Sequence, residues 1–149
     1  MSKRKPLPPT YFNIFLILIF ASHYLLRFVD FIRYPYTLLG FIPIIAGIYF
    51  NLSADKDFKK ASTTVKPFEE STTLITTGVF RITRNPMYMG MFLILFGIAI
   101  ILGSIIPFIF PIAYGFMMHR VFIKAEEKML HKVFGTEWDV YKNNVRRWI

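Results

Sequence analysis

The sequence predicts an all-α fold: a polytopic integral membrane bundle of about four transmembrane helices, followed by a cytoplasmic amphipathic C-terminal helix. Hydrophobic residues make up 54% of the chain, and the mean hydropathy is positive, at +0.45. Four apolar segments approach the roughly 20 residues that a helix needs to cross a bilayer core. We expect these spans at about 11–26, 35–52, 87–105 and 107–123, within a single domain that covers residues 1–149.

The first apolar segment is expected to remain in the protein as a span. A cleaved signal peptide ends at a small-residue cleavage site. No such site follows the segment 11–26, and the charged residues Arg27, Asp30 and Arg33 come next. This pattern indicates a membrane span followed by a polar loop.

The distribution of basic residues predicts the orientation of the spans. Of the 18 Lys and Arg residues, all but Arg27 and Arg33 lie on one side of the predicted membrane. Basic flanks remain in the cytoplasm, so we expect both termini, the loop 53–85 and the tail 124–149 to be cytoplasmic. The basic residues on this side are Lys3, Arg4, Lys5, Lys56, Lys59, Lys60, Lys66, Arg81, Arg84, Arg120, Lys124, Lys128, Lys132, Lys142, Arg146 and Arg147.

Composition and charge also exclude several classes of site. The absence of cysteine excludes disulfides, thiol catalysis and Cys-ligated metals. A net charge of +9 is compatible with nucleic acid, but the basic residues flank apolar runs and are interpreted as membrane flanks instead. The residues His23, His119 and His131 are too scattered for a metal site, and we expect them at the interface or surface.

The connections between spans differ in character. The segment 53–77 is rich in Lys, Thr and Ser and has little helical period, which predicts an irregular loop. The uncharged segment 103–107 predicts a tight helical hairpin between the third and fourth spans. Small residues let helices approach closely, so Gly90 and Gly97 are expected to pack the third span against a neighbour.

The loop that enters the third span carries a candidate anion site. Asn85 is a favoured N-cap residue and Pro86 suits the first helical position. A helix N-terminus with Arg81 and Arg84 beside it is suited to a carboxylate or phosphate. The alternatives are that Asn85 and Pro86 only start the helix, and that the arginines only enforce topology or contact lipid headgroups.

The cytoplasmic tail carries two adjacent acids. Residues 122–134 have a helical period, and Gly135 is a natural helix stop. On a helical wheel Glu126 lies near the centre of the apolar arc, and Glu127 lies at its edge. A carboxylate in an apolar arc needs a partner, which is either an arginine (Arg81, Arg84 or Arg120) or a ligand. The apolar arc consists of Ile123, Met129, Leu130, Val133 and Phe134.

Aromatic residues near the predicted membrane surface have a simple interpretation. Trp and Tyr favour the interface between lipid and water. We therefore expect Trp138, Tyr141 and Trp148 to anchor the tail on the bilayer, and Tyr88 is either a similar anchor or part of a site.

Taken together, the loop and tail motifs resemble those of the isoprenylcysteine carboxyl methyltransferase family, which is related to the phospholipid N-methyltransferases. The first motif runs from Gly78 through Arg84-Asn85-Pro86 to Tyr88, and the second runs from Glu126-Glu127 to Tyr141. Their order and spacing across a helical hairpin make the resemblance specific, and it covers roughly residues 62–149. The segment 63–67 is similar to that of the small prokaryotic branch, which implies a prokaryotic cell membrane as the location.

This resemblance implies an integral-membrane enzyme that uses S-adenosylmethionine. The cofactor would lie at the cytoplasmic ends of the last two spans, and Arg84, Tyr88 and Glu126 would position the reacting groups. The family often has His where Asn85 stands, and the Gly-x-Gly motif of the phospholipid branch is missing. The positions implied as cofactor contacts are Leu74, Ile75, Phe80, Arg84, Asn85, Pro86, Met87, Tyr88, Glu126 and Glu127.

The residues are compatible with this chemistry, because methyl transfer from a sulfonium mainly requires positioning and desolvation. The expected acceptor is lipophilic: an isoprenylcysteine-like carboxylate, or alternatively a phospholipid amine or a small lipophilic thiol or acid. A four-span transporter is the main rival, but the predicted spans contain no Asp or Glu to couple cations. A non-catalytic membrane subunit would not need an acid on the apolar face of the tail. The oligomeric state is not encoded in any pattern that we identified.

Overall fold

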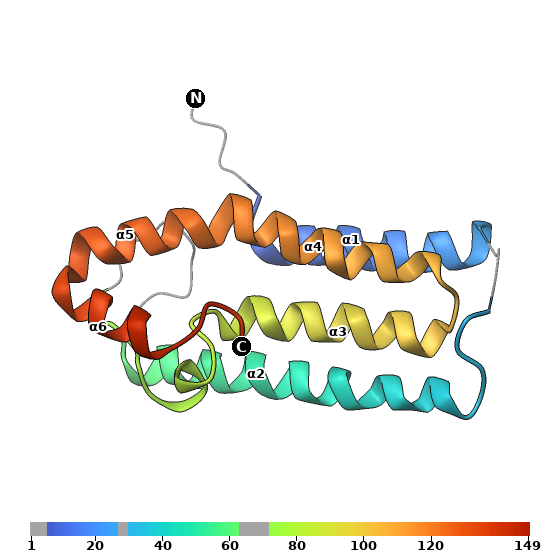
Figure 1. The fold of residues 1–149 in the computed structure, drawn as a ribbon, viewed down its shortest axis with the longest axis horizontal. Helices are drawn as coiled ribbons and strands as arrows, with labels where there is room; N and C mark the ends of the chain where they lie inside the picture. The colour runs from blue at the N-terminus through green and yellow to red at the C-terminus, as the bar shows by residue number, and fades with distance from the viewer. Residues whose placement is uncertain (1–5, 27–29, 63–71) are drawn as a thin grey trace.

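The computed structural model describes residues 6–26, 30–62 and 72–149. Within these ranges the secondary structure is helical apart from an isolated bridge between Asp30 and Ser104, so the predicted all-α class is confirmed. Helices α1 to α4 run alternately in opposite directions along one axis (Figure 1). The basic positions 3–5, 27 and 66, and the segment 63–67, lie outside the described residues. The principal helices are α1 (Pro8–Leu25), α2 (Phe41–Lys60), α3 (Pro86–Leu102), α4 (Ile109–Met118), α5 (Lys124–Phe134) and α6 (Thr136–Asn144).

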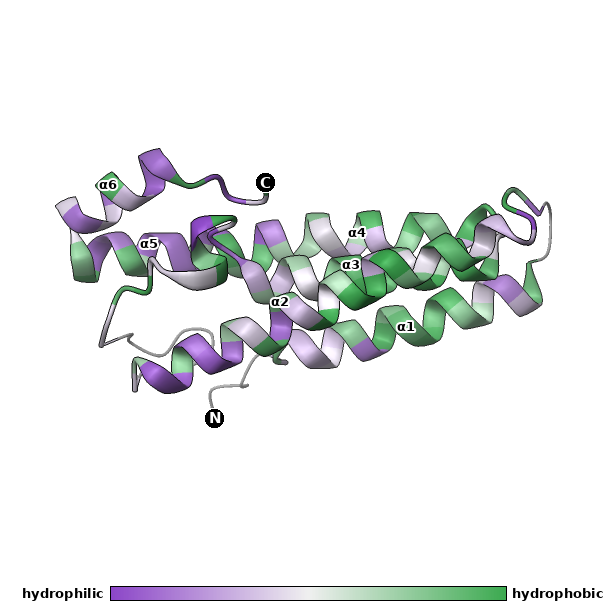
Figure 2. Ribbon diagram, turned by 90° about the horizontal axis from the view of Figure 1, so that it is seen from below, coloured by the Kyte–Doolittle hydropathy of each residue, from purple (hydrophilic) through white to green (hydrophobic). Residues whose placement is uncertain are grey.

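Among the residues that the structure describes, two helices are long and apolar enough to cross a membrane: Tyr36–Lys60, and the continuous helix Ile106–Phe134. The helix Pro86–Leu102 is also apolar but shorter. Apolar residues concentrate along α3 and α4, while polar residues gather at the end of the bundle that carries α5 and α6 (Figure 2). These features indicate a membrane protein, and the number of four spans remains a prediction.

Helix α2 is longer than its apolar segment. It begins after the short 3-10 helix η1 (Tyr36–Gly40) and continues to Lys60, so the expected irregular loop is wrong for residues 53–60. Asp55 and Lys59 form an i,i+4 ion pair at 2.6 Å in the extra turns. Lys59 and Lys60 also lie in the last turn, where cations interact favourably with the helix dipole.

The fourth span and the tail helix form one continuous helix, joined by a π-helical turn, η4 (His119–Ile123). Sequence analysis treated them as separate elements and missed this turn. The wide turn allows residues at four-residue intervals to keep facing the bundle, although an α-helix has 3.6 residues per turn. Val133, expected in the apolar arc, is 43% exposed instead. The inward residues are Tyr114, Met118, Phe122, Glu126, Leu130 and Phe134.

Glycines bring α2 and α3 into backbone contact. A Cβ atom at Gly97 would collide with the carbonyl oxygen of Gly40, and one at Gly90 would collide with that of Gly47. Because only hydrogen occupies these positions, the two helices approach more closely than larger residues allow. The packing role predicted for Gly90 and Gly97 is confirmed.

The opposite end of the bundle is closed by the turn between α3 and α4. The predicted tight hairpin is confirmed, with a single turn, η3 (Ile106–Phe108), between the helices. His23 on α1 lies 2.7 Å from the Ser104 hydroxyl, measured from its Nδ1 atom, and both residues are buried. The expectation of a surface position was therefore wrong for His23, because its ring is enclosed between α1 and this turn.

Helix α6 folds back against the loop before α3. Gly135 has a φ of 51°, which ends α5 as predicted and reverses the chain. Trp138 and Tyr141 are 3% and 7% exposed in a core cluster with Val79 and Phe80, so their predicted role as bilayer anchors was wrong. Their rings pack within the protein because α6 covers the loop.

Candidate functional site

Tyr88 and Glu126 form a pair between α3 and α5. The Tyr88 hydroxyl donates a hydrogen bond of 2.5 Å to Glu126 Oε1, and Tyr88 is only 7% exposed. Tyr88 lies in the first turn of α3, and the π turn directs Glu126 toward it. The predicted inward orientation of Glu126 is borne out, whereas the alternative of an arginine partner was wrong.

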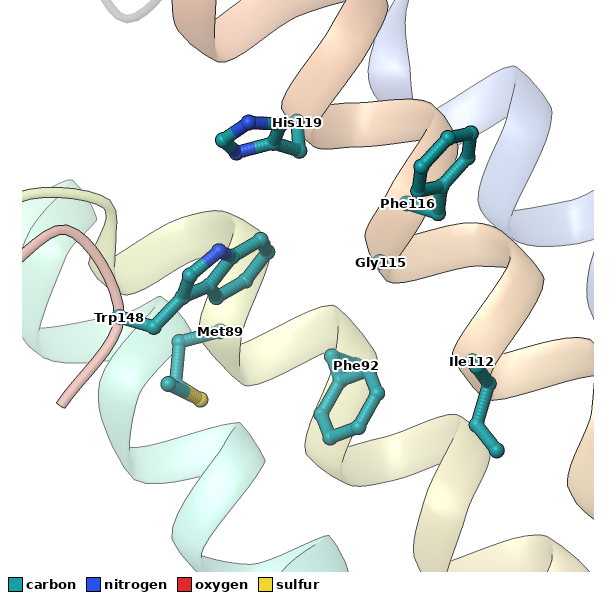
Figure 3. A pocket seen from close by; sticks show the side chains of 7 residues that line it. All are labelled: Met89, Phe92, Ile112, Gly115, Phe116, His119 and Trp148. Carbon is teal, nitrogen blue, oxygen red and sulfur yellow. The ribbon is translucent and has the colours of Figure 1, made fainter.

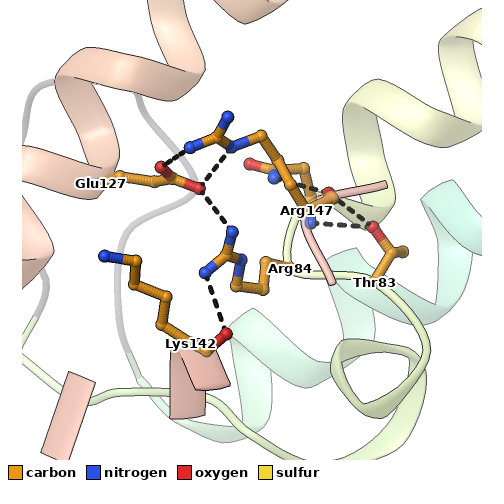
Figure 4. Close-up of polar contacts among 6 residues, drawn as sticks. Thr83, Arg84, Glu127, Lys142 and Arg147 are labelled. Atoms are coloured by element: carbon orange, nitrogen blue, oxygen red, sulfur yellow. Dashed lines mark hydrogen bonds and ion pairs between the residues drawn. The ribbon is translucent and has the colours of Figure 1, made fainter. Parts of the chain in front are cut away.

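Glu127, and not Glu126, forms ion pairs with arginine side chains (Figure 4). Its carboxylate lies 3.2 Å from Arg84 Nη2 and accepts a 2.8 Å hydrogen bond from Arg147 Nε. The side chains of Arg84 and Glu127 are 7% and 13% exposed. Burial lowers the pKa of Arg84, and the Glu127 carboxylate opposes this shift, while the hydrogen bond with Glu127 raises the pKa of Arg147. Both guanidinium groups remain charged near neutral pH.

Arg84 has spare hydrogen-bonding capacity. Its Nη1 donates a long 3.4 Å hydrogen bond to the Lys142 carbonyl oxygen, and its guanidinium lies 5.6 Å from the centre of the Trp138 ring. Its Nε is buried and has no hydrogen-bond partner among the residues that the structure describes. A buried unpaired donor is costly, so this position is suited to an acceptor atom of an anionic ligand.

Asn85 occupies the N-cap position of α3, but its side chain does not cap the helix. Its Nδ2 donates instead to the Arg147 carbonyl oxygen at 2.9 Å, and its backbone N–H donates to Thr83 Oγ1. The expected side-chain cap was wrong because the amide holds the segment that follows α6. Arg81 is exposed at the surface and is not brought into this cluster.

The other predicted contacts lie in a separate apolar cluster. Phe80 is buried there, and Leu74, Ile75 and Met87 pack against it, whereas Tyr88 belongs to the main core between the helices. The Tyr141 hydroxyl donates a 2.7 Å hydrogen bond to the Phe80 carbonyl oxygen, and burial raises the pKa of Tyr141. Pro86, the first residue of α3, is fully buried. In the sequence it lies between Phe80 of the apolar cluster and Tyr88 of the main core.

An apolar groove of about 480 Å³ opens between α3 and α4 (Figure 3). Its lining on α3 starts with Met89, the residue that follows Tyr88 in the chain. His119 is the single titratable residue among those that line it. This groove was not predicted, because all its lining residues but one are ordinary span residues and the exception, Trp148, comes from the distant C-terminal segment. The groove is lined by Met89, Phe92, Ile112, Gly115, Phe116, His119 and Trp148.

No group of three His, Asp or Glu side chains with the geometry of a metal site occurs within residues 6–26, 30–62 and 72–149. The polar site consists of one tyrosine–carboxylate pair and one arginine–carboxylate cluster. Both lie at the loop end of α3, beside an apolar groove. The fold and site therefore define the class of small helical membrane proteins with a charged site at one end of the bundle and an apolar groove leading from it.

Comparison with known proteins assigns the family. A model of the phospholipid methyltransferase family matches residues 35–137. This range includes α2, α3, α4 and α5, and so contains Arg84, Tyr88 and both glutamates, whereas Arg147 and Trp148 lie beyond it. The chain belongs to the phospholipid methyltransferase family.

Two relatives extend this comparison. A protein-S-isoprenylcysteine O-methyltransferase from Saccharomyces cerevisiae is 34% identical over an alignment that covers 73% of this chain and 46% of the yeast protein. The chain thus spans about half the length of that relative. An uncharacterized protein from Haemophilus influenzae is 33% identical over 63 residues, which are 42% of this chain and all of that protein. The predicted similarity to the isoprenylcysteine methyltransferases is confirmed.

Proposed function

We propose that this protein is an S-adenosylmethionine-dependent methyltransferase that acts on a lipophilic acceptor, by carboxyl O-methylation of an isoprenylcysteine-like molecule. The observation that carries this proposal is the position of two polar groups at one end of an apolar groove. The Tyr88–Glu126 pair and the unpaired Arg84 Nε both lie near the N-terminus of α3, and the groove begins at Met89. The family assignment supports the same reaction class.

In this proposal the chain crosses the membrane four times, with both termini and the site in the cytoplasm. The asymmetry of Lys and Arg supports this orientation. The polar ends of α2, α5 and α6 lie together with the loop before α3, as expected for a cytoplasmic face (Figure 2). An acceptor dissolved in the inner leaflet would reach the groove laterally.

The residues divide the recognition of the cofactor among them. Arg84 and the N-terminus of α3 would hold a carboxylate, and the buried Arg84 Nε supports this role. Glu126 would accept hydrogen bonds from an ammonium or ribose hydroxyl. Tyr88 would face the sulfonium through a cation–π contact. Phe80, the alternative for this contact, lies in the other cluster, and there Leu74, Ile75 and Met87 would contact the cofactor as an apolar floor.

S-adenosylmethionine supplies a methyl group that is already activated on a sulfonium. The chain's own residues then need to orient the acceptor and exclude water. A carboxylate acceptor is ionised at neutral pH and has no proton to lose before it attacks. A protonated lipid amine, as in phospholipid N-methylation, needs a base, and His119 is the titratable residue in the lining of the groove. Methylation of a carboxylate therefore needs no base from this site, whereas methylation of a protonated amine does.

Calorimetry in nanodiscs tests the binding step. We expect about one site per chain for S-adenosylmethionine or its demethylated product, with micromolar affinity, about −8 kcal/mol. Arg84→Lys keeps the charge but removes the planar donors and should weaken binding by about tenfold. The exposed neighbour Arg81 provides the control variant Arg81→Lys. No binding at millimolar ligand by a folded protein would overturn the proposal.

The reaction product identifies the acceptor chemistry. Membrane extract is incubated with the protein and S-adenosylmethionine carrying a labelled methyl group. A methyl ester releases labelled methanol in mild base, whereas a methylated amine keeps its label. Base-stable label in a lipid would show that the reaction is phospholipid N-methylation and would overturn the proposal of carboxyl methylation.

A further inference from the structure

The segment 145–149, which we call the strap, is attached to the loop before α3 by its backbone. The Arg146 carbonyl oxygen accepts a 3.0 Å hydrogen bond from the Arg84 backbone N–H. The Arg147 carbonyl oxygen accepts two more, from Thr83 Oγ1 at 3.1 Å and from Asn85 Nδ2 at 2.9 Å. Three hydrogen bonds over two residues set the path of the strap across the start of α3.

The side chain of Arg147 attaches the strap to the opposite wall. Its Nε and Nη2 both donate to the Glu127 carboxylate, at 2.8 and 2.5 Å, so that the pair is bidentate (Figure 4). Such pairs constrain geometry as well as charge. The strap therefore bridges the loop and α5, and the position of residue 148 depends on both attachments.

Trp148 is the part of the strap that enters the groove. The strap leaves α6 at Val145, whose backbone is extended, and it bends at Val145 and again at Arg147. Arg147 faces Glu127, and the indole of Trp148 faces the groove, with its ring centre 6.4 Å from that of Phe92 (Figure 3). Trp148 also packs against the main core.

The remaining groove walls are span residues. Ile112 and Phe116 on α4 are 65% and 61% exposed, as expected where a groove opens toward lipid. On α3 the groove reaches Met89, the residue that follows Tyr88 in the chain, so it lies at the same end of α3 as the proposed reaction site. Under the proposed function its occupant would be the apolar chain of the methyl acceptor, and a groove of this size is typical of ligand sites.

We infer that Trp148 determines which acceptors are used, by limiting the bulk of the apolar chain that the groove admits beside the Tyr88–Glu126 pair. This inference rests on the proposed function. Trp148 belongs to neither α3 nor α4, so it forms a wall that the strap holds in place. Arg147 is a positioning residue for Trp148, because its pairing with Glu127 fixes the adjacent backbone.

Acceptor selectivity tests this role. Methylation rates are measured for N-acetyl-S-alkyl-cysteines with linear chains and with branched, bulkier chains of equal length. Trp148→Ala should raise the ratio of bulky to linear rates by about tenfold, and Trp148→Phe should raise it less. Ile149, on the same strap, is 67% exposed and provides the control Ile149→Ala, which should leave the ratio unchanged. An unchanged ratio in a folded Trp148→Ala protein would overturn the inference.

A binding measurement separates this inference from the proposed function. The chain has two tryptophans, so Trp138→Phe leaves Trp148 as the single tryptophan, whose fluorescence is excited selectively, and Trp148→Phe leaves Trp138. An S-(bromoalkyl) member of the same series should quench Trp148 strongly and Trp138 weakly. Strong quenching of Trp148 without any binding of S-adenosylmethionine would support the groove as a binding site for apolar chains and reject the proposed methyltransferase function. Equal quenching of both tryptophans, or none, would reject the groove whatever the cofactor does.

Discussion

The Tyr88 hydroxyl donates a 2.5 Å hydrogen bond to Glu126, although the two residues lie on different helices, 38 positions apart. The neighbouring Glu127 binds Arg84 and Arg147 instead. Two adjacent acids thus have different partners. Glu126 pairs with a neutral hydroxyl, and Glu127 pairs with two guanidinium groups. This difference predicts different consequences when each acid is replaced.

Replacing Glu126 is expected to affect cofactor binding more than folding. Glu126→Gln keeps an oxygen that can accept the Tyr88 hydroxyl but removes the charge proposed to contact the cofactor. A charge-assisted hydrogen bond contributes about 1.5–3 kcal/mol, so binding of S-adenosylmethionine should weaken by roughly 10- to 100-fold. Calorimetry on the folded variant measures the change. Affinity equal to that of the wild type would make Glu126 a structural acid only.

Replacing Glu127 is expected to affect folding more than binding. Glu127→Gln leaves the buried Arg84 without its balancing charge, and we expect a loss of about 3 kcal/mol in unfolding free energy. The value is at the low end for buried pairs because the Arg147 side chain is 33% exposed. Thermal unfolding in detergent measures it, with the exposed acid Glu137 providing the control Glu137→Gln. A variant as stable as the control would show that the cluster contributes little.

The glycine contacts between α2 and α3 predict which substitutions the bundle tolerates. Gly97→Leu places a side chain against the Gly40 carbonyl oxygen and should prevent folding or shift α2 away. At Gly115 an added Cβ would lie 3.4 Å from Phe92, an ordinary contact, so Gly115→Ala should fold normally. Monodispersity in size-exclusion chromatography and helical content by circular dichroism compare the two. Normal folding of Gly97→Leu would contradict the close packing.

The proposed orientation predicts the accessibility of single cysteines. The natural chain has no cysteine, so each introduced thiol is the only one. A cysteine at Lys60 should react with an impermeant maleimide only after the cells are opened. A cysteine at Tyr34, which is 79% exposed at the other end of the bundle, should react in intact cells. Labelling of the Lys60 variant in intact cells would show that this end of α2 faces outward, opposite to the proposed orientation.

Much of the architecture could be predicted from local patterns. Apolar runs, an uncharged hairpin and a helical tail that ends at Gly135 depend on the residues in one segment, so hydropathy and periodicity reveal them. The inward position of Glu126 was predicted in the same way. The extension of α2 beyond residue 52 was not, because a charged helical turn with an Asp55–Lys59 pair has the same composition as a polar loop.

The sequence by itself determined the all-helical class, the two paired motifs and hence the family resemblance, because these depend on residue type and spacing along the chain. Only the tertiary structure decided which partner each acid takes, because the π turn at His119–Ile123 changes the phase of the helix and brings Glu126 to Tyr88. It also placed Arg147 and Trp148 at the site. Their positions depend on three hydrogen bonds to residues about 60 positions earlier, at 83, 84 and 85, and such long-range contacts leave no local pattern.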